Sequence, residues 1–328
     1  MCLSGRKEFL LVIQCLTYNQ SEFIADALHG FAIQQTNFPF LTLVFEDAST
    51  DGEQEVIKSY MNEHLDHSEE TGYKQWETED ACYTFARHQE NENCFFMVAL
   101  LKKNLYRNPR KGELMKAWYD NAKYIALCEG DDYWIDPLKL QKQVDFLEGH
   151  EEYAMCFTNC LVNQAGSVSY GNAFIWDTYT TEDMLLHNSL DMIKRGDHVV
   201  SPGHTSTILY RNPKEPRPDW ISKCFIGDEP LFIALSKYGK AKFINDATSV
   251  YREGVGVSST DFSFERDKCN RVQMYKLIDK GFDYKYHRLI SSKIISRYYK
   301  KLTRIALNEK HYFKSIGYFL RSLWAKIV

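Results

Sequence analysis

Residues 124–134 read YIALCEGDDYW, an uncharged run followed by three acids around a single glycine, and this stretch decides how the 328-residue chain folds. The run has the length of a strand that is buried on both faces, and Gly130 allows a tight turn where the strand ends. Ligands in open α/β sheets bind at the carboxyl ends of the strands. Asp131 and Asp132 are therefore candidate ligand-binding residues.

The sequence before this stretch alternates between strand-like and helix-like segments. Strands are predicted at 9–13 and 40–45, each followed by an amphipathic helix, at 21–31 and 56–61. This order is typical of a parallel α/β sheet with right-handed crossovers. Residues 62–93 hold nine acids against two basic residues, which predicts an exposed excursion from the core before a strand at 95–100 resumes the sheet.

Two further acidic clusters occupy similar positions. Residues 46–52 read EDASTDG after the second strand, and Asp228-Glu229 lies where a loop is expected to pass into a helix. Adjacent acids at a strand end suit a hard divalent cation that keeps open positions for phosphate oxygens. The Ser-Thr-Asp-Gly sequence around Asp51 is also good turn and helix-cap chemistry, so both interpretations of Asp51 stay open.

Taken in order, these motifs resemble glycosyltransferase family 2, bacterial inverting nucleotide-sugar enzymes with the GT-A fold. The resemblance covers roughly residues 9–260, and its motifs are Thr17-Tyr18-Asn19, 46–52, 128–134, 136–147, 227–231 and 251–256. It implies an α/β fold with a Rossmann-like mixed sheet flanked by helices. It also implies a catalytic domain over residues 1–260 and a helical C-terminal extension over residues 261–328.

The resemblance implies a role for several residues. Thr17, Tyr18 and Asp47 would surround the nucleotide base, where an aromatic face stacks on the ring and a carboxylate accepts from its imide N–H. Asp131 would lie near the ribose or the sugar. Asp132 would hold a divalent metal, Mn²⁺ or Mg²⁺.

Asp228 aligns with the catalytic base of the family, and Glu229 is the next candidate. The chain departs from the family at Glu46, which stands where the first aspartate of the usual pair is found. It also lacks the histidine often found after the segment that contains Arg252.

The implied function is metal-dependent, inverting transfer of a hexosyl group from a nucleotide sugar, UDP-linked, to a hydroxyl of a glycan or lipid-linked acceptor. Such a reaction would serve polysaccharide synthesis for the bacterial cell envelope. One alternative is a nucleotidyltransferase that makes nucleotide sugars, but its glycine- and basic-rich phosphate loop is missing because the first turn reads Leu16-Thr17-Tyr18-Asn19. A non-catalytic protein that binds sugar nucleotides or glycans is the other alternative.

The net charge of −4 conceals an asymmetry. Residues 284–328 hold eleven Lys and Arg against one acid, a net charge of +10, which leaves −14 for residues 1–283. The acidic body makes nucleic acid an unsuitable partner. The helical tail carries an apolar stripe among its cations: Tyr312, Phe313, Ile316, Phe319, Leu320, Leu323, Trp324 and Ile327. This stripe could pack on the catalytic domain, contact another subunit or lie on an anionic membrane, as interfacial helices do.

Cysteine usage and hydropathy bear on the compartment. Nine cysteines without a C-x-x-C pair indicate a reducing environment, and we expect neither a secretory leader nor a membrane-spanning run. The sequence predicts a cytoplasmic protein, peripheral on the inner face of the cytoplasmic membrane if the tail binds lipid.

Overall fold

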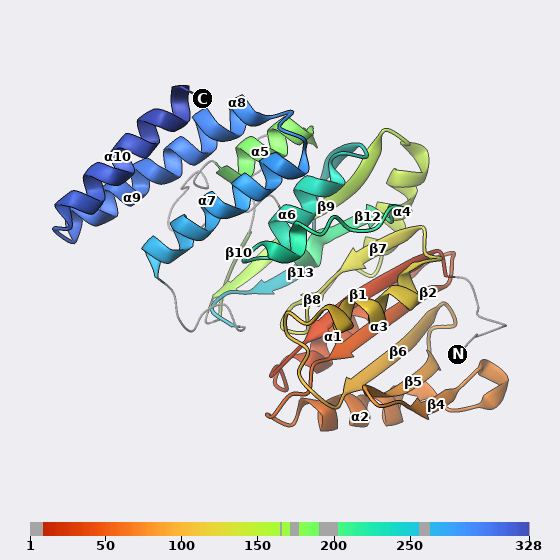
Figure 1. Ribbon diagram of the computed structural model, residues 1–328. Coiled ribbons are helices and arrows are strands. Elements are labelled where there is room, and N and C mark those ends of the chain that lie inside the picture. Colours follow the sequence, from red (N-terminus) through yellow and green to blue (C-terminus); the bar gives the residue numbers. More distant parts are fainter. Residues whose placement is uncertain (1–8, 165, 171–176, 190–202, 256–262, 328) are drawn as a thin grey trace. The chain divides into compact units, whose positions relative to one another are not determined.

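The computed structural model describes residues 9–164, 166–170, 177–189, 203–255 and 263–327 (Figure 1). The chain divides into two compact units that alternate along the sequence. Unit 1 comprises residues 1–178, 203–214 and 241–256, and unit 2 comprises residues 179–202, 215–240 and 257–328. The division into domains at residue 260 stays a prediction.

Unit 1 is built on a mixed sheet. Its main strands are β1 (Leu11–Thr17), β2 (Phe40–Glu46), β3 (Leu65–Asp66), β5 (Ala81–His88), β6 (Cys94–Leu101), β7 (Tyr124–Leu127), β9 (Tyr153–Gln164), β12 (Ile208–Arg211) and β13 (Lys240–Arg252). They follow the order β13-β9-β12-β7-β1-β2-β6-β5-β3. Three short strands pair at the sides of this path: β4 (Lys74–Glu77) with β5, β8 (Tyr133–Trp134) with β13, and β10 (Ser167–Tyr170) with β9. Another short strand, β11 (Thr178–Tyr179), marks the passage to unit 2.

Strands β7, β1, β2 and β6 run parallel, so their carboxyl ends lie at one edge of the sheet. Every residue of β2 and β6 is buried, which agrees with the unbroken apolar sequence of β6 and with a β2 that is apolar except at Thr42 and Glu46. Four helices flank the sheet: α1 (Ile24–Ala32), α2 (Glu53–His64), α3 (Pro109–Tyr119) and α4 (Lys139–Gly149). Phe31 of α1 meets Trp134 edge to face, with ring centroids 5.0 Å apart. The predicted fold class is confirmed.

Residues 62–93 are not the excursion that their acid content predicts. Strand β5 lies in this segment and pairs antiparallel with β6 from Ala81 to Arg87. Thr84, Ala86 and His88 are buried while Phe85 and Arg87 are partly exposed, so the second half of β5 has the alternation of a sheet strand. Most of the nine acids lie in the flanking turns and in β4. The acid content of the whole segment therefore did not reveal the strand within it.

Unit 2 is helical. Its helices are α5 (Thr181–Ser189), α6 (Asp228–Leu235), α7 (Phe264–Gly281), α8 (His287–Leu289), a π-helical turn (Ile290–Ile295), α9 (Ser296–Asn308) and α10 (Tyr312–Ile327). Tyr275 and Ile278 of α7 share a core with Ile294 and Tyr298. The predicted C-terminal helical extension is thus present.

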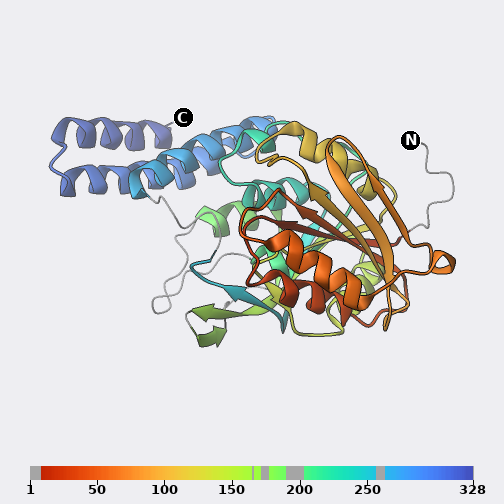
Figure 2. The ribbon, with the colours of Figure 1, turned by 90° about the horizontal axis from the view of Figure 1, so that it is seen from below.

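Helices α9 and α10 form an antiparallel pair at the end of the chain (Figure 2). The hydroxyl of Ser291 donates to the carbonyl of Ala325 at 2.7 Å, and that of Ser296 donates to the carbonyl of Ser322 at 3.0 Å. Among the described residues, no helix combines the length and the apolar character that crossing a membrane requires.

Candidate functional site

The turn after β1 is tied to the turn after β2 by a carboxylate. Thr17 is buried, and its hydroxyl donates to the side chain of Glu53. The same carboxylate accepts from the backbone N–H of Gln20 at 3.0 Å and from Oγ of Ser49 at 2.8 Å. Burial raises the pKa of Glu53, and these three donors oppose that rise. Glu53 therefore fixes the relative position of two loops at the carboxyl edge of the sheet.

Glu53 could not be predicted as a site residue, because an acid at the start of a helix is ordinarily there for the helix itself. In the structure Gly52 is the N-cap of α2, and Oδ1 of Asp51 accepts from the N–H of Glu53 at 3.1 Å. Its Oδ2 accepts from the N–H of Ser21 at 2.9 Å. Nearby, the buried Glu46 accepts from the N–H of Ser49 at 2.6 Å, so it has a structural role.

The acidic turn after β7 packs directly on the turn after β1, and Gly130 makes this possible. A Cβ atom at Gly130 would lie 2.8 Å from Cβ of Thr17, closer than real side chains approach. The N–H of Gly130 also donates to the carbonyl of Leu16 at 3.3 Å. The structure thus brings Thr17 and the Asp131-Asp132 turn together, as the strand ends predict.

Replacing Gly130 with alanine is expected to push these two turns apart. Overpacking of a tight site typically costs ~1–3 kcal/mol, and here part of that cost falls on the geometry of the acidic turn. We expect Gly130→Ala to lower the free energy of unfolding in urea and to weaken binding of UDP. The control is Gly149→Ala, because a Cβ atom at Gly149 meets nothing within 4 Å. Equal behaviour of the two variants would contradict the close packing.

Asp131 and Asp132 differ in their surroundings. Asp132 is 4% exposed, and its Oδ1 accepts from the N–H of Arg252 at 3.1 Å. Burial, assisted by the charge of Asp131, raises the pKa of Asp132 to about 7. Burial also raises the pKa of Asp131. Oδ1 of Asp131 is buried and has no hydrogen-bond partner among the described residues.

Arg252 holds the acidic turn from β13. Its Nη1 donates to the carbonyl of Asp131 at 2.8 Å, and its Nη2 forms an ion pair with Asp26 at 2.5 Å. The guanidinium lies over the rings of Tyr133 and Phe23, 4.4 and 4.9 Å from their centroids. The segment around Arg252 stands out in the sequence, but this role of Arg252 could not be predicted because it depends on residues far apart in the chain.

The residues after the acidic turn belong to the core. Trp134 is 1% exposed, and its indole N–H donates to the carbonyl of Ser206 at 2.8 Å. The ammonium of Lys139 lies 4.7 Å from the centroid of the Trp134 ring, and burial lowers the pKa of Lys139 to about 8. His204 stacks on Tyr251, and burial lowers its pKa to about 4, so its imidazole is neutral.

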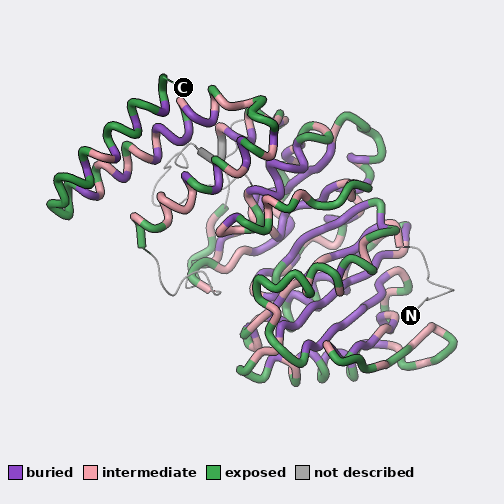
Figure 3. Tube along the Cα trace, in the orientation of Figure 1, coloured by how far each residue is buried: buried purple, intermediate pink, exposed green. Residues whose placement is uncertain are grey.

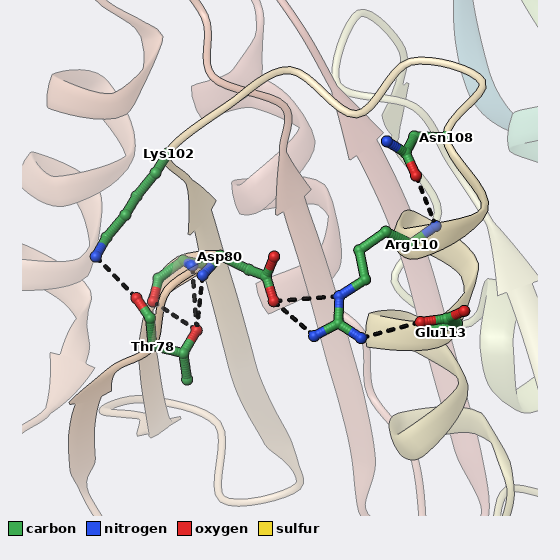
Figure 4. Close-up of polar contacts among 7 residues, drawn as sticks. Thr78, Asp80, Lys102, Asn108, Arg110 and Glu113 are labelled. Carbon is green, nitrogen blue, oxygen red and sulfur yellow. Dashed lines mark hydrogen bonds and ion pairs between the residues drawn. The ribbon is translucent and has the colours of Figure 1, made fainter.

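Asp47 follows β2 and is buried beneath the segment before α3. Its Oδ1 accepts from the N–H of Leu105 at 2.6 Å, and its Oδ2 pairs with Nζ of Lys111 at 2.6 Å. Arg110 anchors this segment by an ion pair with Asp80 at 2.7 Å, beside the cap that Asn108 provides to α3 (Figure 4). The carboxylate of Asp47 therefore already accepts from two donors of the chain itself. Tyr18 is half-buried directly after β1.

Asp228 and Glu229 lie in unit 2, at the start of α6. Asp228 is exposed, and its Oδ1 accepts from the N–H of Glu229 at 2.8 Å. Glu229 pairs with Arg271 at 2.7 Å and accepts from the hydroxyl of Tyr275 at 2.8 Å. Burial raises the pKa of Glu229, and the Arg271 charge opposes this. Glu229 is therefore committed to the helical core, and Asp228 keeps an exposed carboxylate.

The structure places five of the six predicted residues in unit 1, each just after or at the end of a strand: Thr17, Tyr18, Asp47, Asp131 and Asp132. No group of three or more His, Cys, Asp or Glu side chains able to hold a metal is found within the described residues.

Comparison with known proteins bears on the fold. No family model matches the chain. Residues matching uncharacterized protein Rv1520 of Mycobacterium tuberculosis are 35% identical over 145 residues, which is 44% of this chain and 33% of that protein. Uncharacterized protein Mb1547 of Mycobacterium bovis gives the same values. The match thus spans about a third of the length of these relatives.

Among solved structures, residues 1–349 of S. aureus TarS in complex with UDP-GlcNAc match with a TM-score of 0.55 and 15% identity, over 97% of this chain and 80% of that one. A longer structure of S. aureus TarS matches with a TM-score of 0.51 and 15% identity, over 89% of this chain and 44% of that one. The chain therefore has a GT-A-like fold, which resembles that of S. aureus TarS.

Proposed function

We propose that this protein is an inverting glycosyltransferase that moves a sugar from a UDP-linked donor to a hydroxyl acceptor. The observation that carries the proposal is the Asp131-Asp132 turn at the carboxyl edge of a GT-A-like sheet. Gly130 lets this turn pack against Thr17, and Arg252 donates to the carbonyl of Asp131. The buried Oδ1 of Asp131 has no hydrogen-bond partner among the described residues. A buried acidic turn held this firmly favours a charged ligand.

Three residues would bind the nucleotide. Thr17 ends β1 and Tyr18 follows it, and the half-buried Tyr18 would stack its ring on the base. Asp47 accepts from Leu105 and Lys111, and a carboxylate has about four lone-pair sites in total. Its remaining acceptor capacity would serve the imide N–H of uracil.

A divalent cation fits the acidic turn. Mg²⁺ and Mn²⁺ prefer carboxylate oxygens, and Oδ1 of Asp131 is a buried oxygen without a partner among the described residues. We assign Asp132 to the cation, as the resemblance implies, and add Asp131 because Oδ1 of Asp132 already accepts from Arg252. When bound, the cation would stabilise the charge on the departing diphosphate.

Asp228 is proposed as the base that removes the proton from the acceptor hydroxyl. Its carboxylate is exposed at the first position of α6, whereas Glu229 is occupied by Arg271 and Tyr275. A single displacement assisted by one base inverts the anomeric centre. The acceptor in this proposal is a glycan or a lipid-linked sugar of the cell envelope, which would place the enzyme on the inner face of the cytoplasmic membrane.

The test is release of nucleoside diphosphate from a panel of nucleotide sugars with Mn²⁺ or Mg²⁺, after a thermal-shift screen for the donor that stabilises the protein. We expect stabilisation by a UDP-sugar and release of UDP. Formation of a nucleotide sugar from a sugar phosphate and UTP, with release of pyrophosphate, would indicate a nucleotidyltransferase. Thermal stabilisation by a nucleotide sugar without transfer to any acceptor would indicate a non-catalytic protein that binds sugar nucleotides.

Replacing Asp47 with alanine is expected to weaken binding of UDP. A hydrogen bond to a charged group contributes about 1.5–3 kcal/mol, which corresponds to roughly a 10- to 100-fold rise in the dissociation constant. The measurement is isothermal titration calorimetry with UDP. Lys111→Gln is the control, because it removes a partner of Asp47 but keeps the carboxylate. Unchanged affinity in Asp47→Ala would remove Asp47 from the nucleotide site.

A further inference from the structure

Helix α10 packs with its small side chains inward. Ser315, Ser322 and Ala325 are buried, and the hydrogen bonds from Ser291 and Ser296 show that this side lies against the π-helical turn and α9. The large apolar side chains of α10 are exposed, and we call them its outer face: Tyr312, Phe313, Ile316, Phe319, Leu320, Leu323, Trp324 and Ile327. Figure 3 shows most of α10 as exposed.

The outer face is a contiguous apolar surface. Its exposed fractions range from 41% at Leu323 to 93% at Phe313. At 3.6 residues per turn, Phe313, Leu320 and Trp324 fall on one stripe, on the opposite side of the helix from Ser315 and Ser322. Packing of α10 within the described chain therefore leaves the stripe uncovered, and exposed patches of this kind mark interaction surfaces.

Cations border the outer face and continue onto α9. Arg321 lies along one side of the stripe and Lys326 along the other, by the same helical geometry, while Lys314 beside Arg321 is paired with Glu265. Lys326 lowers the pKa of Lys300, and Arg297 and Arg304 add to that effect. A surface that holds like charges this close together gains from an anionic partner.

We infer that the outer face of α10 lies on an anionic lipid surface, with its apolar side chains at the boundary of headgroups and acyl chains and the flanking cations at the lipid phosphates. An apolar face between basic borders is the pattern of an interfacial helix. A second copy of the chain is a poorer occupant, because a twofold interface would bring the same cations against each other. This surface deepens the proposed function, on which it rests for the membrane location, by naming the face of the chain that contacts the lipid.

The experiment is co-sedimentation of the full chain with vesicles. We expect binding to vesicles of phosphatidylglycerol and phosphatidylcholine in equal parts, no binding to pure phosphatidylcholine, and release as salt is added. Release of UDP from the donor in solution is measured in parallel, so that loss of lipid binding is not confused with loss of the fold.

Two sets of variants separate the apolar and the charged contributions. Leu320→Ser combined with Trp324→Ser is expected to lower the partition coefficient at least about 10-fold. The matched control is Val168→Ser combined with Tyr170→Ser, which removes two side chains that are 57% and 73% exposed in β10. That control should bind lipid like the unmodified protein.

The charged set replaces three cations with glutamine: Lys300, Arg304 and Lys326. We expect roughly a 10- to 100-fold loss of binding at low salt and a shallower dependence on salt. The control makes the same change of charge at three exposed lysines elsewhere: Lys103, Lys214 and Lys223.

Three results would overturn the inference. The protein could stay in the supernatant with anionic vesicles at low salt, or it could bind neutral vesicles equally well. It could also sediment as a dimer that Leu320→Ser with Trp324→Ser splits while lipid has no effect, which would make the outer face an interface between copies. Circular dichroism of each variant checks that the helices persist.

Discussion

Changing Asp131 to asparagine is expected to lower transfer at least ~10³-fold while the protein stays folded. The substitution keeps the shape of the side chain but removes the charge and one acceptor oxygen from the turn. Stabilisation of a developing charge by a bound cation accounts for several kcal/mol, and each 1.36 kcal/mol is a factor of ten in rate. The measurement is release of UDP from the donor at increasing Mn²⁺, together with Mn²⁺-dependent binding of UDP.

Asp132→Ala is expected to abolish the same two signals, but it also removes the acceptor of the Arg252 N–H. Asp131→Asn is therefore the cleaner variant, because Oδ1 of Asp131 has no partner to lose among the described residues. Asp120→Asn, on the exposed surface, is the control. If either variant of the turn transfers sugar normally in EDTA, the proposed metal role is wrong.

Asp228→Asn is expected to lower turnover by ~10²-fold or more, with little change in donor affinity. Asparagine has nearly the same shape but cannot accept the proton, and general-base catalysis contributes ~10²–10⁴-fold. Single-turnover kinetics with saturating donor measure the chemical step, and calorimetry measures donor binding.

Glu229→Gln separates the base from its neighbour. Removing one partner of a buried ion pair typically costs about 3–5 kcal/mol, so this variant should unfold at lower urea concentration because Arg271 loses its carboxylate. We expect its turnover per folded molecule to stay near that of the unmodified protein. Normal turnover in Asp228→Asn with loss in folded Glu229→Gln would move the base to Glu229.

The parallel strands and the acidic turn could be predicted because their signals are local. An uncharged run such as 124–128 has few alternatives to a buried strand, and Gly130 followed by two acids marks its end. Strand β5 was not predicted because acids in its flanking turns dominated the composition of residues 62–93, although Thr84, Ala86 and His88 alternate with more exposed residues as a strand requires.

Glu53 and Arg252, which hold the loops of the candidate site, could not be predicted from the sequence for a different reason. Glu53 has the position of a helix cap, and only the closeness of Thr17 and Ser49 in space gives it another task. The role of Arg252 depends on Asp26, Phe23 and Tyr133, which the fold brings together from separate segments. Such partners are set by tertiary packing, which no spacing along the chain reveals.

The alternation of the two units along the sequence has a consequence for folding during translation. The Asp131-Asp132 turn leaves the exit tunnel long before Arg252, which binds it, because Arg252 follows Asp132 by 120 residues. At a translation rate of ~5–20 residues per second, roughly 6–24 s pass before Arg252 is synthesised. During the first part of this interval β7 also lacks its neighbour β12 (Ile208–Arg211), which is made before Arg252. Competence of the acidic turn is therefore acquired late in translation, after most of the sheet that carries it has emerged.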